Sequence, residues 1–158
     1  MPAHADVESA DGRAVIIRPL SFINYEDLNF GKIIPASTAG TVTVAPNGTR
    51  TTNNSNIVLV GTDHQAARFT GQGTFNQRVD ISLASNTIVI NGAGTPMTVS
   101  TFTIGSTPSV VLTTTPTRFR IASANGIFAF TVGARLNVAA NQAPGKYSGT
   151  WNITLNYQ

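Results

Sequence analysis

The sequence contains no cysteine, which excludes thiol catalysis, disulfides and thiolate metal sites. Cysteine usage therefore does not indicate whether the protein works in an oxidising or a reducing compartment. It has only two histidines and no acidic loop of the Asp-x-Asp type, so it offers few candidate metal ligands. At 158 residues a single domain is expected, and a chain of this length buries enough surface to fold without a metal or a disulfide.

The sequence also has few helix-forming residues and few charges. Leu, Glu, Lys, Met and Gln together number 18, whereas Val, Ile, Thr, Phe, Tyr and Trp number 60. Strands favour the second group, so the composition predicts an all-β chain. No apolar run approaches the roughly 18 residues that a membrane-spanning helix needs, so no membrane span is expected.

Charge is distributed unevenly along the chain. Residues 1–27 carry five acids against Arg13 and Arg18, a net charge of −3, whereas residues 28–158 carry a net charge of +6. Only Arg118 and Arg120 lie close together among the bases, on one face of an expected strand. A surface that follows nucleic-acid phosphates gathers more bases than this, so no nucleic-acid partner is expected.

The N-terminus has the pattern of a cleaved export signal. Ala3 and Ala5 occupy the small-residue positions of a signal-peptidase site, and the acidic, polar segment from Asp6 follows. We therefore expect an exported protein, in the periplasm and then at the cell surface or outside the cell. The expected organisation is a signal-peptide remnant over residues 1–5, an N-terminal arm over residues 6–13 and one β-sandwich domain over residues 14–158. The arm is the candidate donor strand, which reaches to about residue 17.

From Arg13 onward, short β segments alternate with turn residues at the spacing of a sandwich or barrel. We expect the dipeptide Asn125-Gly126 to form a tight hairpin turn that pairs its two flanking strands, and the polar run 49–56 to be a loop. The expected strands are 14–23, 28–34, 41–45, 56–60, 67–70, 78–84, 87–90, 97–104, 110–113, 118–123, 127–132 and 147–157.

The last expected strand is the most informative. Its apolar residues alternate with hydroxyl and amide side chains, which predicts one face on a core and one in solvent. Trp151 falls on the apolar face, which favours a core position over a sugar-stacking platform. A strand this long must be paired on both edges or it will template association. The apolar face carries Tyr147, Gly149, Trp151, Ile153, Leu155 and Tyr157.

No residue pattern indicates an enzyme. Asp63 and His64 are adjacent, but neighbours in a strand point to opposite faces and in a turn are solvated. No serine or threonine is marked out as a nucleophile beside a base. We therefore predict no catalytic residue, no metal site and no cofactor.

Eight short segments, in order, carry a resemblance to a bacterial domain-of-unknown-function family. This family consists of exported proteins of Gram-negative bacteria and is similar to fimbrial and spore-coat-U-type pilins. The ending is also similar to that of a chaperone–usher pilin, with Gly145 fourteenth from the C-terminus and Tyr157 penultimate. The segments are Pro19-Leu20-Ser21, Leu28 to Pro35, Gly40 to Val44, Gly48-Thr49-Arg50, Met97-Thr98-Val99, Val132 to Val138, Asn141 to Gly145 and Tyr147 to Thr150.

The resemblance implies an immunoglobulin-like antiparallel sandwich that a strand from a neighbouring subunit completes. It implies a filament subunit whose partners are copies of itself and a periplasmic chaperone or usher. The alternative is a monomeric secreted or cell-surface binding module. The expected contact residues of the C-terminal strand are Tyr147, Trp151, Ile153, Leu155 and Tyr157, and those of the donor arm are Val7, Val15 and Ile17.

Overall fold

A computed structural model of the protein describes residues 8–158. This part of the chain contains strands and no helix, which confirms the all-β prediction. None of its segments is therefore a helix that could cross a membrane. The strands are β1 (Ser21–Glu26), β2 (Lys32–Ile34), β3 (Gly40–Val44), β4 (Arg50–Thr52), β5 (Val58–Val60), β6 (Ala67–Gln72), β7 (Arg78–Leu83), β8 (Thr87–Ile90), β9 (Met97–Ile104), β10 (Val110–Val111), β11 (Thr117–Arg120), β12 (Ile127–Val138) and β13 (Ile153–Tyr157).

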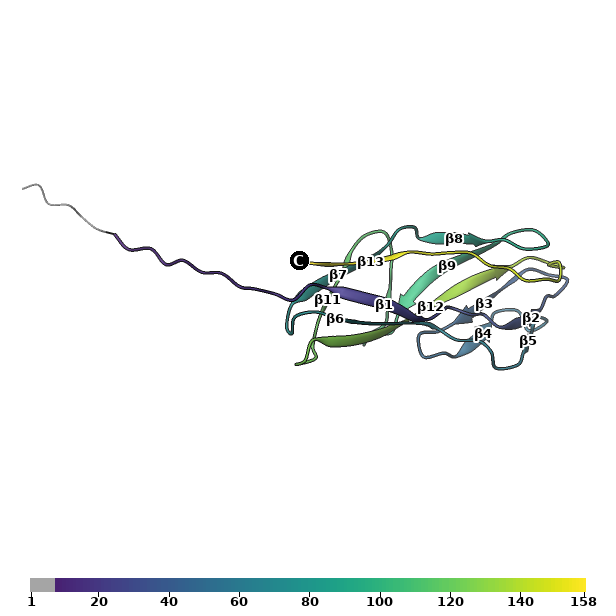
Figure 1. Cartoon of the computed structure of the whole chain (residues 1–158). Helices are drawn as coiled ribbons and strands as arrows, with labels where there is room; N and C mark the ends of the chain where they lie inside the picture. Colours follow the sequence, from purple (N-terminus) through teal and green to yellow (C-terminus); the bar gives the residue numbers. More distant parts are fainter. Residues whose placement is uncertain (1–7) are drawn as a thin grey trace, which may run out of the picture.

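The strands form an antiparallel β-sandwich. The larger sheet has the order β1-β6-β12-β3-β4. In addition, β9 pairs with β12, and β8 and β10 both pair with β9. A smaller sheet has the order β11-β7-β13, and β2 pairs with β5 in a separate two-stranded sheet. Figure 1 shows β13 and β1 along the length of the sandwich and β2 with β5 at the end away from the N-terminal arm.

The long strand β12 connects both halves of the larger sheet. Its first half pairs with β6, its second half pairs with β3, and β9 pairs across residues 132–136. The pairing with β9 shifts register next to Gly133, where a Cβ atom would overlap the main-chain oxygen of Val44. Only glycine permits this close approach of two backbones, so Gly133 lets β12 bend between its partners.

The core follows the alternation of side chains along the central strands. In β9, Met97 and Val99 point inward, and after Thr101 the inward positions become Phe102 and Ile104. Thr101 has a positive φ of 54°, at the point where the register with β12 shifts. An irregularity there moves the buried positions from odd to even numbers and keeps both halves of the strand on the core.

Several expected strands, such as 28–34, 56–60 and 110–113, are shorter in the structure, and the two at the ends of the chain lose the most residues. The strand expected over 14–23 begins only at Ser21, because the preceding segment has no neighbouring strand to pair with and Pro19 lacks an N–H donor. The strand expected over 147–157 is regular only from Ile153. Before it, a single antiparallel bridge joins Ser148 to Asn91, so the chain is extended there but paired at one point.

Two local predictions are wrong. The run 49–56 contains β4, which pairs with β3 and is not a loop throughout. The Asn125-Gly126 turn forms, with the Gly126 N–H donating to the Ser123 oxygen at 2.9 Å, but its flanking strands do not pair. Instead β11 pairs with β7, and β12 pairs with β6. The turn carries the chain from one sheet to the other.

Candidate apolar groove

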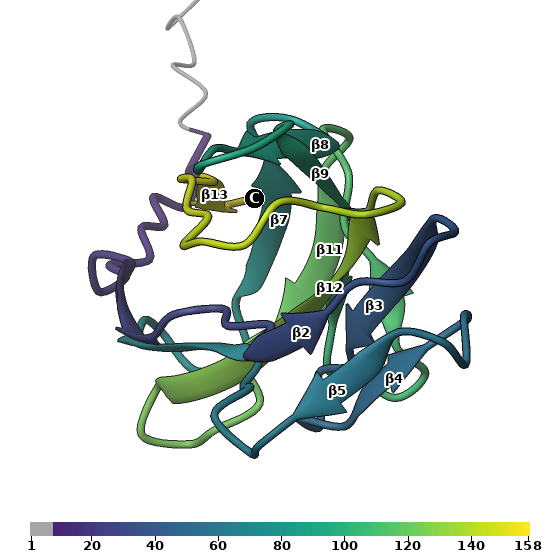
Figure 2. The ribbon, with the colours of Figure 1, turned by 90° about the vertical axis from the view of Figure 1, so that its right-hand side faces the viewer.

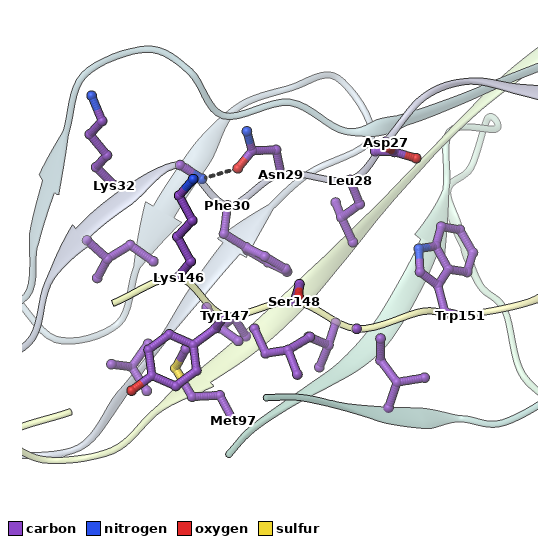
Figure 3. Close-up of a pocket in the computed structure, with 18 of the residues that line it drawn as sticks. Asp27, Leu28, Asn29, Phe30, Lys32, Met97, Lys146, Tyr147, Ser148 and Trp151 are labelled. Atoms are coloured by element: carbon purple, nitrogen blue, oxygen red, sulfur yellow. Dashed lines mark hydrogen bonds between the residues drawn. The ribbon is translucent and has the colours of Figure 1, made fainter. Parts of the chain in front are cut away.

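A groove with a volume of about 1280 Å³ runs between two segments from opposite ends of the sequence. One wall is formed by residues 27–35, after β1, and the other by residues 142–151, before β13. Figure 2 shows these segments from the end of the sandwich where β2 and β5 lie. Figure 3 shows Leu28 and Phe30 on the first wall and Tyr147 and Trp151 on the second.

The floor of this groove is apolar. It consists of residues that the strands of the larger sheet direct inward, and most of them are buried. Such side chains belong to a core, and here they also border an open space. The floor residues are Phe69 of β6, Ile88 and Ile90 of β8, Met97 and Val99 of β9, and Leu136 and Val138 of β12.

Tyr157 lies beyond the end of the groove that Ile153 lines, and it joins β13 to the root of the arm. Its hydroxyl donates to the main-chain oxygen of Arg18 at 2.8 Å and accepts from the N–H of Thr74 at the same distance. Leu20 packs against the core beside it. From this end the groove extends from Ile153 toward Pro35 and Lys146. The first and last segments of the described chain are therefore joined at one end and separated at the other.

The open end carries a polar cluster around Gln142. This side chain is only 8% exposed, and its Nε2 donates to the oxygen of Thr95 at 2.6 Å and to the hydroxyl of Tyr147 at 2.9 Å. The Tyr147 hydroxyl in turn donates to the oxygen of Ala143 at 2.7 Å. Within residues 8–158, Oε1 of Gln142 has no hydrogen-bond partner. The cluster fixes Tyr147 in the second wall.

The first wall is held by Arg50. Its guanidinium donates to the main-chain oxygens of Phe30 and Lys32 at 2.9 and 3.3 Å. It also donates to those of Val60 and Gly61 at 3.2 and 3.0 Å. A guanidinium has five N–H donors in a fixed plane and can satisfy several carbonyls at once. Arg50 therefore connects β4 to the β2–β5 sheet.

The structure divides the predicted contact residues of the C-terminal strand into three places. Tyr147, Trp151 and Ile153 line the groove, and Leu155 is buried in the core. Tyr157 lies outside the groove and is bonded to the root of the arm. Trp151 stacks on Phe102 with ring centroids 4.9 Å apart, so its predicted packing on the core is confirmed.

The predicted donor residues lie away from this groove. Val15 and Ile17 belong to an extended arm that leaves the sandwich at the end where the C-terminus lies (Figure 1), and Val7 lies outside the described residues. Sequence reasoning missed the first wall and the floor as site residues. The alternation of Ile88 and Ile90 with Thr87 and Val89 indicated a half-buried strand, but a local pattern does not show that its buried face borders a groove.

The other sequence candidates lie outside the groove. Asp63 is exposed and forms an ion pair with Lys32 at 3.5 Å. His64 follows in the same loop, half-buried, and its Nδ1 has no hydrogen-bond partner within the described chain. Arg118 and Arg120 share the exposed face of β11, as predicted, and Arg118 pairs with Asp80 at 3.3 Å. Residues 8–158 contain no group of His, Cys, Asp or Glu side chains that could hold a metal ion.

The fold and the groove define a class of protein: an antiparallel β-sandwich with an apolar groove between its first and last segments. Residues 20–157 match the family described as "Domain of unknown function (DUF4402)", so the chain belongs to the DUF4402 family. The search of curated proteins and the search of solved structures each give no match to this chain.

Proposed function

We propose that the protein is a structural subunit of an extracellular surface filament of the pilus or fimbria type, assembled by addition of a β-strand from one subunit to the sandwich of the next. The observation that carries this proposal is the apolar groove beside an unpaired strand edge, in a chain whose own apolar arm projects from the opposite end. The sandwich is then of the immunoglobulin-like type, and the arm supplies the strand that completes it.

The unpaired edge belongs to β13. The Ala84 N–H donates to the Asn152 oxygen and the Gln158 N–H to the Arg78 oxygen, so even-numbered residues of this strand bond to β7. In an antiparallel ladder, successive residues direct their main-chain groups to opposite edges. Ile153 and Leu155 therefore direct theirs to the other edge, where no strand within residues 8–158 pairs. An added strand satisfies such an edge with main-chain hydrogen bonds.

The arm has the apolar side chains that such a strand needs. Val15 is 83% exposed, Ile16 is 96% exposed and Ile17 is 38% exposed. Three consecutive large apolar residues in water are costly, since burying each of them stabilises a protein by roughly 1.5–3 kcal/mol. In an extended strand Val15 and Ile17 lie on one face. We assign this face to the groove.

A neighbouring copy fits the groove better than the chain's own arm. In Figure 1 the arm projects away from the sandwich from the Tyr157–Arg18 junction, so it must reverse its direction to enter its own groove. An arm that enters another copy from the open end runs antiparallel to β13, which is the more stable pairing. A contact between unlike ends does not close on itself and produces a filament.

The charges of the two ends favour this encounter. The first 27 residues carry a net charge of −3, and the remainder of the chain carries +6. Lys32 and Lys146 border the open end of the groove. Opposite charges on two partners raise the association rate more than the final affinity, so they promote docking of an acidic arm at this end.

Peptide binding tests this proposal directly. Trp151 is the only tryptophan and it lines the groove, so its fluorescence reports occupation of the groove. A peptide of residues 6–20 should shift the emission and bind saturably. A peptide with Val15→Asp and Ile17→Asp should bind at least tenfold more weakly. A peptide with Ala14→Asp and Ile16→Asp, on the opposite face, serves as the charge-matched control. Equal binding of all three peptides, or no binding of any, contradicts strand addition.

Assembly of the full chain provides the second readout. The parent chain should form linear oligomers in sedimentation velocity and negative-stain microscopy, and the variant with Val15→Asp and Ile17→Asp should remain monomeric. A parent chain that neither associates nor binds the peptide supports the alternative, a monomeric secreted or cell-surface binding module.

A further inference from the structure

We infer that the exposed face of the β2–β5 sheet is a second contact surface, which receives the arm-bearing end of the neighbouring subunit around Phe75. This inference rests on the proposed function, because strand addition brings the two ends together. We call the outer face of β2 and β5, formed by Ile34, Val58 and Val60, the distal patch.

The distal patch follows from the register of two short strands. Ile34 pairs with Val58 and Lys32 with Val60, so all four side chains share one face. Ile33 and Leu59, on the other face, pack against the core. On the outer face Ile34 is 53% exposed, Val58 49% and Val60 37%, which makes a small apolar surface on a sheet that already has a buried side.

This patch is continuous with the open end of the groove. Lys32, Ile33 and Ile34 line the groove and also form β2. Figures 1 and 2 place β2 and β5 at the end of the sandwich opposite to the arm. The Arg50 guanidinium binds main-chain oxygens of both segments of this sheet, so the patch is held in a fixed position beside the groove.

The matching surface lies where the arm leaves the body. Phe75, in the loop after β6, is 50% exposed and borders a hollow of about 250 Å³ together with Ile16 and Arg18. The N–H of Arg18 donates to the hydroxyl of Thr74, next to Phe75, at 2.7 Å. The arm root and the Phe75 loop are therefore joined at this point.

Chain length brings the two surfaces together. If Ile17 of one subunit occupies the open end of the next groove, only Arg18 separates it from the body that carries Phe75. One or two residues span at most about 7 Å, so the Phe75 loop must lie against the rim of the groove. This short link through Arg18 raises the local concentration of the Phe75 surface at the distal patch, so that even a small apolar contact contributes to binding.

The test uses the full chain and two readouts, arm-peptide binding and self-association. Val58→Asp and Phe75→Ser should each weaken self-association about tenfold or more in sedimentation velocity, with unchanged affinity for the arm peptide. Val111→Asp is the matched control, because Val111 is also a strand valine that is 49% exposed. The control should associate like the parent chain. Thermal unfolding of all variants verifies that they remain folded.

A charge pair tests direct contact. Val58→Asp combined with Phe75→Lys in one chain should associate more strongly than either single variant, since each junction then contains one opposite pair. Parent-like association of both single variants, or no rescue in the combined variant, overturns the second contact while strand addition stands. If the parent chain binds the peptide but does not self-associate, the second contact is likewise overturned and strand addition stands. Loss of peptide binding in the parent chain overturns the proposed function and this inference together.

Discussion

The hydroxyl of Tyr157 donates a hydrogen bond to the main-chain oxygen of Arg18 at 2.8 Å and thereby joins two residues 139 positions apart in the sequence. The same hydroxyl accepts from the N–H of Thr74. One side chain thus fixes the root of the arm, the loop after β6 and the end of β13. This junction sets the point at which the arm leaves the sandwich.

Tyr157→Phe should lower the free energy of unfolding by about 1–2 kcal/mol, because it removes two hydrogen bonds at almost constant volume. Urea denaturation measures the change. Tyr25→Phe is the control, since Tyr25 is exposed and its hydroxyl has no hydrogen bond within the described residues. Equal effects of the two substitutions would show that the junction contributes nothing to folding.

Arg50→Lys should destabilise the protein by about 2–3 kcal/mol. A lysine ammonium cannot reach four carbonyls in two segments at once, and hydrogen bonds from charged donors are each worth roughly 1.5–3 kcal/mol. Hydrogen exchange should show faster opening of β2 and β5 than of β12. Arg135→Lys, at an exposed position of β12, is the control and should change stability by less than about 0.5 kcal/mol.

An Arg50→Lys variant with parent stability and unchanged exchange in β2 and β5 would contradict the role assigned to this guanidinium. The comparison also bears on the distal patch, because a loosened β2–β5 sheet presents a less ordered surface to a neighbouring copy.

Local patterns in the sequence predicted the faces of the strands. The alternation after Trp151 is present as expected, with Ile153 and Leu155 inward and Thr154 and Asn156 exposed. Such faces depend on the period of two within a strand and need no knowledge of its partner. The sequence predicts a strand that ends at Val132, whereas β12 continues to Val138. Gly133 and Arg135 interrupt the apolar pattern, and only the close approach of Val44 explains the glycine.

Which strands pair, and whether a groove forms between them, depends on contacts between residues that lie far apart in the sequence. Asn125-Gly126 forms a turn, but the fold separates β11 from β12 because each pairs with a strand formed some 40 to 60 residues earlier. Likewise, Ile90 and Met97 have the pattern of ordinary core residues. Only the arrangement of all strands shows that they border a groove rather than a packed interior.

Gly133→Ala should destabilise the protein by at least about 2–3 kcal/mol, since the added methyl group would overlap the Val44 oxygen and force two paired strands apart. Gly12→Ala is the matched control: no atom lies within 4 Å of the added Cβ, so stability should stay within about 0.5 kcal/mol. Thermal unfolding of both variants measures the difference. Parent-like stability of Gly133→Ala would show that β12 relaxes without losing β3.

Gln142→Leu should lower the free energy of unfolding by about 1–2 kcal/mol, because the main-chain oxygen of Thr95 loses its donor and Tyr147 loses one of its two partners. Hydrogen exchange should increase over residues 143–149, the second wall of the groove. Gln72→Leu, exposed on β6, is the control. A more stable Gln142→Leu variant would show that the unpartnered Oε1 costs more than the two Nε2 bonds provide.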